Sequence, residues 1–122
     1  MNALDMAQRA YAPTTAPTRS NRSIEYEVIA RITHRLKRAV EKGDFVRLVE
    51  TLHENRKLWR AFAIDVADEQ NSLPPDLRSR IFYLAEFTNQ HTREVMGKRA
   101  SAIPLLEINT AILRGLKPVG VS

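Results

Sequence analysis

Side chains able to support catalysis or metal binding are few in this chain, and their spacing is unfavourable. His34, His53 and His91 each lack a second histidine at the i+3 or i+4 position that a helical zinc site requires. The adjacent carboxylates Asp68 and Glu69 would point about 100° apart on a helix, so they would not converge on one ligand. The chain has no cysteine and only four isolated glycines, which excludes thiolate chemistry and a glycine-rich phosphate loop. We therefore expect no enzyme, no metal ion and no cofactor.

A second set of polar residues has a more informative spacing, because it falls on apolar stripes. Asn55, Thr88, His91 and Asn109 occupy such positions, and each would cost about 1–3 kcal/mol if buried without a hydrogen-bond partner. One interpretation is that the helices pair these groups with one another and so fix their register. The other is that some of them line a groove and bind a partner's backbone. We favour the structural role for both asparagines, and a core position over an interface anchor for the single tryptophan, Trp59.

A basic stripe is the feature best suited to nucleic acid. Spacings of four, three and four residues place its members along one flank of a helix: Arg31, Arg35, Arg38 and Lys42. No aromatic residues are interleaved with them to stack on bases, and two neighbouring glutamates reduce their field. A solvated helix flank is therefore the favoured interpretation, and RNA contact is the alternative.

Composition places these residues in a single small domain. The chain has 122 residues, is 43% hydrophobic and carries a formal net charge of +5. Basic and acidic residues are mixed throughout, which favours solubility over nucleic-acid binding. No apolar run approaches the roughly 20 residues needed to span a bilayer, and residues 1–12 do not resemble a secretory signal. We expect a cytoplasmic protein with no membrane insertion, and the absence of cysteine suits a reducing compartment.

The apolar periodicity predicts four helices and no strand. Gly43 is expected to end the first helix and Asp44 to cap the second, while Pro74 suits the first position of the third. Gly97 and Gly115 should end the third and fourth. The expected helices are 23–42, 45–70, 74–96 and 104–114.

These elements predict an all-α fold, an antiparallel bundle of about four helices with a short, mobile N-terminal helical arm. Two prolines and three threonines in residues 12–18 prevent a continuous helix there. We expect residues 1–19 to form the arm and a Pro/Thr linker, 20–116 the bundle domain and 117–122 a flexible tail.

Several short motifs along the bundle resemble the FlaF family of flagellar biosynthesis regulators. The first is Asn-Arg-Lys-Leu-Trp at 55–59, followed by Asn-Ser-Leu-Pro at 71–74. His-Thr at 91–92 and Val-Met at 95–96 are similar to a segment of the family's third helix. Leu-Glu-Ile-Asn at 106–109, Ile112 and Gly-Leu at 115–116 fit its end. The likeness runs from about residue 22 to 116.

This resemblance implies a function that the residues alone do not. FlaF proteins act after transcription to permit flagellin production, generally in opposition to the regulator FlbT. Their role is similar to that of a flagellin-specific chaperone or secretion factor, without enzymatic activity or a known cofactor. Flagellin is thus the expected partner, with FlbT as a further one.

Three hypotheses follow. In the first, an amphipathic flagellin helix binds in a groove between the second and third helices, with the arm able to cover the groove. The residues expected to contact that partner are Asn55, Arg56, Leu58, Trp59, His91, Thr92 and Asn109. In the second, the chain is a translational regulator that binds flagellin messenger RNA through the basic stripe. In the third, it is an adaptor that binds FlbT only.

Overall fold

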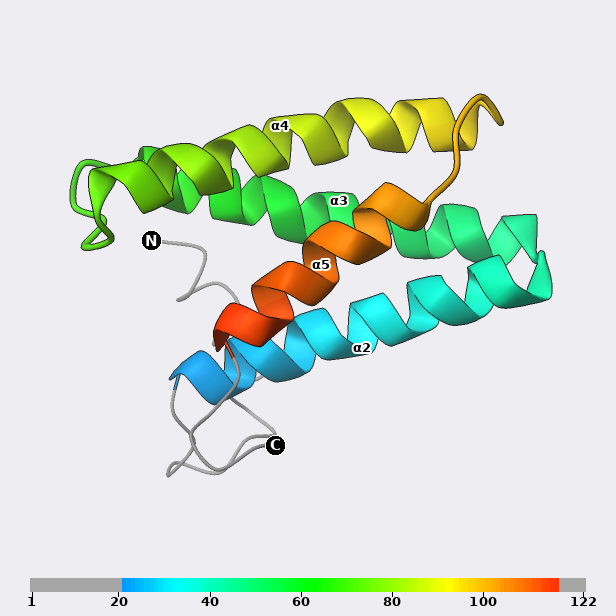
Figure 1. Ribbon diagram of the computed structural model, residues 1–122, viewed down its shortest axis with the longest axis horizontal. Coiled ribbons are helices and arrows are strands. Elements are labelled where there is room, and N and C mark those ends of the chain that lie inside the picture. Colours follow the sequence, from blue (N-terminus) through cyan, green and yellow to red (C-terminus); the bar gives the residue numbers. More distant parts are fainter. Residues whose placement is uncertain (1–20, 117–122) are drawn as a thin grey trace.

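The computed structural model describes residues 21–116, with side chains from Tyr26 to Gly115. The predicted arm, linker and tail lie outside these residues. The described chain forms four helices without strands, which confirms the predicted all-α bundle (Figure 1). The helices are α2 (Asn21–Lys42), α3 (Phe45–Ala67), α4 (Pro75–Met96) and α5 (Ile103–Leu116).

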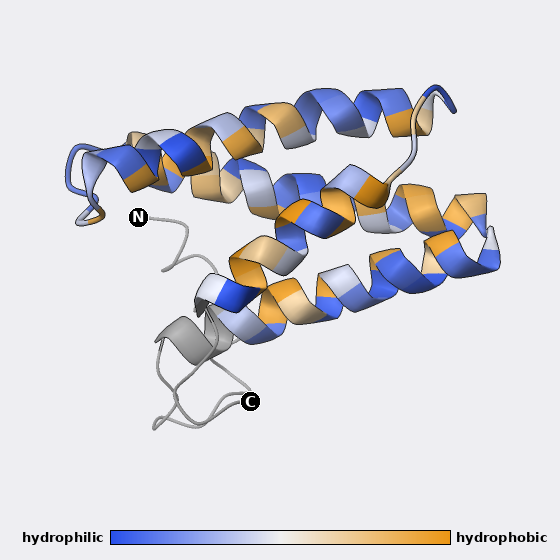
Figure 2. Ribbon diagram, viewed as in Figure 1, coloured by the Kyte–Doolittle hydropathy of each residue, from blue (hydrophilic) through white to orange (hydrophobic). Residues whose placement is uncertain are grey.

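Helix α3 is central, because it packs against α2 on one side and α4 on the other. Helix α5 packs mainly on α2 and makes a smaller contact with α4. Figure 1 shows α5 starting beside the C-terminal end of α4 and diverging from it toward α2. Helices α3 and α5 are therefore diagonal to each other, and side chains bridge the space between them. Hydrophobic and hydrophilic residues are interspersed along each helix, as expected for amphipathic helices (Figure 2).

The turn between α2 and α3 is as predicted. Gly43 has a φ of 65° and donates its N–H to the carbonyl of Val40 at 3.1 Å, while Asp44 donates to Ala39 at 3.1 Å. This pair of bonds is a Schellman motif, which favours glycine at the left-handed position. The Asp44 carboxylate then accepts from the backbone N–H of Arg47 and caps α3. Two residues thus end one helix and begin the next.

Helix α3 is shorter than predicted: it ends at Ala67 and not near residue 70. The Asp68 side chain accepts a hydrogen bond from the Gln70 N–H at 2.9 Å, a local bond that competes with a further helical turn. From α4, the Arg78 guanidinium donates to the carbonyls of Val66 and Asp68, both at 2.9 Å. These bonds satisfy the carbonyls that the helix end leaves without partners.

The ends of α4 and α5 also differ slightly from the prediction. The Pro74 carbonyl accepts the first helical bond, from Arg78, so Pro74 is the N-cap and Pro75 the first helical residue. Helix α4 ends at Met96, as predicted. Helix α5 begins one residue before Pro104 and continues through Gly115 to residue 116. A glycine near a helix end is tolerated within the helix at a cost of about 1 kcal/mol.

The main hydrophobic core lies at the end of the bundle that holds the α2–α3 turn and the start of α5. It is formed by Leu36, Leu52, Val95, Ala102 and Leu105. Each of the leucines contributes about 1.5–3 kcal/mol by leaving water.

The face that α4 buries includes one of the two polar residues predicted on its apolar stripe. Thr88 is buried, whereas His91 is half-buried. The buried residues are smaller: Ala85, Thr88, Thr92 and Val95. Small side chains at this interface allow α4 to approach α3 closely.

Candidate functional site

A hydrogen-bonded network of polar side chains joins three helices in the bundle centre. Asn109 of α5 accepts a bond from the Trp59 indole N–H at 2.9 Å. Its Nδ2 donates to Asn55 Oδ1 at 2.8 Å and to Thr33 Oγ1 at 3.1 Å. Asn55 and Asn109 have no exposed surface, and Trp59 is 1% exposed. The two asparagines that the sequence placed on apolar stripes are thus bonded to each other.

Trp59 fixes the orientation of both amides. An indole N–H only donates, so the Asn109 atom facing it must be the oxygen. The Asn109 nitrogen is then the donor toward α3, and Asn55 must present its oxygen. As a consequence, Asn55 Nδ2 points elsewhere, and it is buried without a hydrogen-bond partner in the described part of the chain. The network is directional, and it leaves an unmet donor at one end.

The polar residues on the stripe of α4 lie outside this network. Thr92 donates its hydroxyl hydrogen to the carbonyl of Thr88 at 2.6 Å, whereas the Thr88 hydroxyl has no partner in the described region. His91 Nε2 donates to the carbonyl of Ser101 at 2.7 Å. Its ring stacks on Phe87 with centroids 5.2 Å apart. His91 therefore ties α4 to the segment leading into α5.

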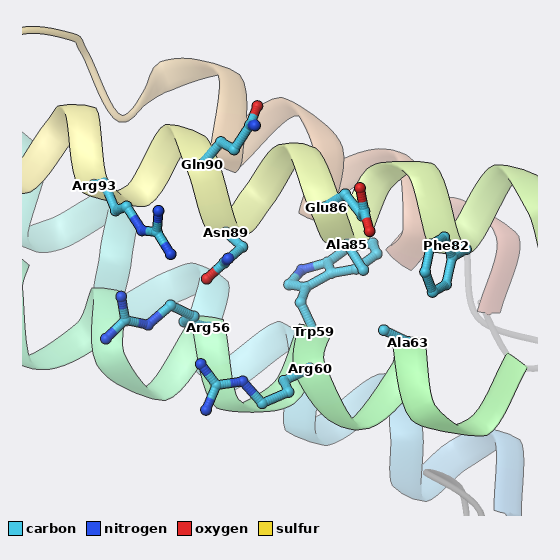
Figure 3. A pocket seen from close by; sticks show the side chains of 10 residues that line it. All are labelled: Arg56, Trp59, Arg60, Ala63, Phe82, Ala85, Glu86, Asn89, Gln90 and Arg93. Atoms are coloured by element: carbon cyan, nitrogen blue, oxygen red, sulfur yellow. The ribbon is translucent and has the colours of Figure 1, made fainter. Parts of the chain in front are cut away.

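A surface groove of about 310 Å³ lies between α3 and α4, the helix pair for which a groove was predicted (Figure 3). The two helices are antiparallel, so Arg56 lies opposite Arg93, and Ala63 opposite Phe82. Between these ends, α3 contributes Trp59 and Arg60, and α4 contributes Ala85, Glu86, Asn89 and Gln90.

The two ends of this groove differ chemically. Figure 3 shows the guanidinium groups of Arg56, Arg60 and Arg93 at one end, with Asn89 beside them, and Phe82 at the other. Arg56 donates a hydrogen bond to His53 Nδ1 at 3.1 Å. The lining therefore holds three arginines against one acidic residue.

Several large apolar side chains of α3 and α4 are exposed. Phe82 itself is 41% exposed, and its neighbour Tyr83 is 68% exposed. Ile64 of α3 and Leu77 of α4 are also exposed.

The structure divides the predicted partner-binding residues into two groups. Arg56 and Trp59 line the groove, although Trp59 is almost fully buried. The others lie outside the lining: Asn55, Asn109 and Thr92 are buried, and Leu58 and His91 are half-buried. The groove residues that the sequence interpretation missed are chiefly Arg60, Phe82, Asn89 and Arg93. The i, i+4 spacing of Arg56 with Arg60, and of Asn89 with Arg93, was the available signal.

The basic stripe lies on α2, away from this groove. Arg31, Arg38 and Lys42 are exposed, but Arg35 forms an ion pair with Glu54 of α3. That pairing joins two helices and withdraws one cation from the surface field of the stripe.

None of the helices among residues 21–116 combines the length and the apolar character that a membrane span requires. In the same range, no three histidine or acidic side chains gather in a way that could hold a metal ion.

Comparison with known proteins identifies the family. The family model described as flagellar protein FlaF matches residues 7–116, which is most of the chain. The match begins some 15 residues before the expected start near residue 22, so it includes part of the predicted arm and linker. No curated protein and no solved structure matches the chain significantly. The motifs at 55–59, 71–74, 91–96 and 106–116 all lie within the matched range, and the chain belongs to the FlaF family of flagellar proteins.

Proposed function

We propose that this flagellar protein acts in the cytoplasm, after transcription, by binding flagellin as a chaperone or secretion-promoting factor. It would do so without enzymatic chemistry, by holding an amphipathic flagellin helix in the groove between α3 and α4. The observation that carries this proposal is the groove itself, which is open to solvent and has the exposed Phe82 side chain at one end. A helix in such a groove is held through apolar anchors at i, i+3, i+4 and i+7.

The buried network supports a structural role for its own residues and leaves partner binding to the groove. Asn55, Asn109 and Trp59 hold α5 against α3 from within. The side of α3 that faces α4 is thereby placed on a stable framework, and the groove on its surface is preformed. A preformed groove avoids part of the ordering cost of binding.

Co-expression with flagellin tests the proposal. We expect a complex that survives purification in low and moderate salt. Phe82→Ser should weaken it by about tenfold or more, because an aromatic anchor is lost from the apolar end. Phe45→Ser is the matched control, since Phe45 is 36% exposed, close to the 41% of Phe82, but lies at the start of α3. Absence of a complex, or equal weakening by both variants, would contradict flagellin binding in this groove.

The two alternatives give different results in the same system. An adaptor for FlbT would co-purify with FlbT and not with flagellin alone. An RNA-binding regulator would bind flagellin messenger RNA with an affinity that falls steeply with salt. In that case, changing Arg31, Arg35 and Arg38 together to Ala would abolish RNA binding.

A further inference from the structure

The groove between α3 and α4 contains arginines that are not paired with an acidic residue of the described chain. Several basic residues elsewhere in the described chain pair with nearby acids, as in Arg35–Glu54, Lys37–Glu41 and Arg99–Glu94. Arg60 and Arg93 form no such ion pair with any described residue. Their charges therefore contribute no pairing energy to the bundle, although they lie close to a third arginine.

The spacing of these arginines suits carboxylates on a helix. Arg56 and Arg60 are one helical turn apart on α3, and Arg93 faces them from α4 (Figure 3). Residues at i and i+4 on a partner helix are about 6 Å apart, similar to the separation of the two positions on α3. A guanidinium binds a carboxylate through two parallel N–H···O bonds, with Asn89 available as a further donor.

The opposite end of the groove excludes a purely ionic ligand. Ala63 and Phe82 form an apolar wall there, and the stretch from Arg56 to Ala63 spans about 10 Å along α3. A polyanion such as RNA would leave this wall uncovered, and the buried Trp59 ring offers no face on which a base could stack. A two-turn amphipathic segment covers both ends.

From this arrangement, we propose that the groove selects an acidic amphipathic helix. The helix would place carboxylates at i and i+4 against Arg56, Arg60 and Arg93, and apolar residues about one turn further on against Phe82. This inference rests on the proposed function for its site, and it specifies the chemistry of the flagellin segment that docks there.

Charge reversal provides the test. Arg60→Glu/Arg93→Glu is compared with Arg80→Glu/Arg114→Glu, a double variant with the same change in net charge at exposed positions outside the groove. The probes are intact flagellin and two synthetic helical peptides with one apolar face. One peptide carries glutamates at i and i+4, and the other carries lysines at the same positions. Circular dichroism is used to check that both double variants keep the helical content of the wild type.

We expect the groove variant to bind flagellin and the glutamate peptide about 10- to 100-fold more weakly, and the control to bind them within about threefold of wild type. The groove variant should prefer the lysine peptide, and the difference should shrink in high salt. Flagellin binding that is equal in both double variants would overturn the inference while leaving the proposed function intact. Glutamate-peptide binding without flagellin binding would contradict the proposed function and support the inference. A groove that binds a single-stranded RNA oligonucleotide more tightly than the glutamate peptide would also overturn it.

Discussion

Asn109 is the position at which one substitution should most disturb the bundle. Replacing it with Leu keeps the number of side-chain heavy atoms but removes the acceptor of the Trp59 N–H and the donor to Asn55. Both groups are buried, so water cannot replace the lost bonds. Thr33 is half-buried, and its hydroxyl can turn to solvent.

The magnitude follows from the two groups left without partners. Each costs about 1–3 kcal/mol, and the added apolar burial of leucine offsets part of the total. We expect Asn109→Leu to lower the free energy of unfolding by about 2–4 kcal/mol. For a domain of this size, that corresponds to a fall in Tm of roughly 10–30 °C.

Asn55→Leu is the informative comparison. It removes one hydrogen bond, worth about 1 kcal/mol, but it also removes the unpartnered Nδ2. Asn109 keeps its bond to Thr33. The expected change is therefore within about 1 kcal/mol of zero, and the double variant should be more stable than Asn109→Leu alone. Flagellin binding by Asn55→Leu should match wild type, because Asn55 does not reach the surface.

Urea denaturation followed by Trp59 fluorescence and by circular dichroism measures all three variants, and the four proteins together form a double-mutant cycle. If Asn55→Leu destabilised the fold as much as Asn109→Leu does, the directional network would be refuted. A loss below about 1 kcal/mol for Asn109→Leu would show that the network contributes little. Unchanged stability of Asn55→Leu combined with lost partner binding would defeat its structural role.

Three further predictions concern the helix ends. Gly43→Ala should lower the free energy of unfolding, measured in urea, by about 1 kcal/mol, because the φ of 65° at this position disfavours an L residue. Steric clash is not the reason, since a Cβ here would meet no atom within 4 Å. An unchanged urea midpoint would contradict this prediction. Arg78→Met should cost about 1 kcal/mol and speed amide exchange near Val66, since two carbonyls lose their donor. The hydrogen bond and charge of Arg99 lower the pKa of Glu94 below its ordinary value of 4.5. This pair therefore stabilises the fold above that pH, and the stabilisation is lost as the pH falls through the lowered pKa. Arg99→Met should therefore reduce stability at neutral pH but not in acid, and an equal loss at both would refute the assignment.

Much of the local structure was accessible from the sequence, because its causes lie within a few residues. Apolar spacing defined four helices, and the Gly43–Asp44 turn ends one helix and caps the next through bonds that span at most five residues. The errors at Ala67 and Pro75 have local causes too. The Asp68 side chain accepts a hydrogen bond from the backbone two residues further on, and the first accepting carbonyl of α4 lies one residue later than expected.

The pairing of side chains was decided only by the tertiary structure. Polar residues on apolar stripes were visible in the sequence, but not that Asn109 would meet Asn55 and Trp59, which are 54 and 50 residues away along the chain. The placement of Arg60 and Arg93 along one groove depends in the same way on how α4 is rotated against α3. Periodicity fixes which face of a helix is apolar to within about one residue. The rotation and crossing of packed helices, set by the fit of all their side chains together, determine which atoms touch.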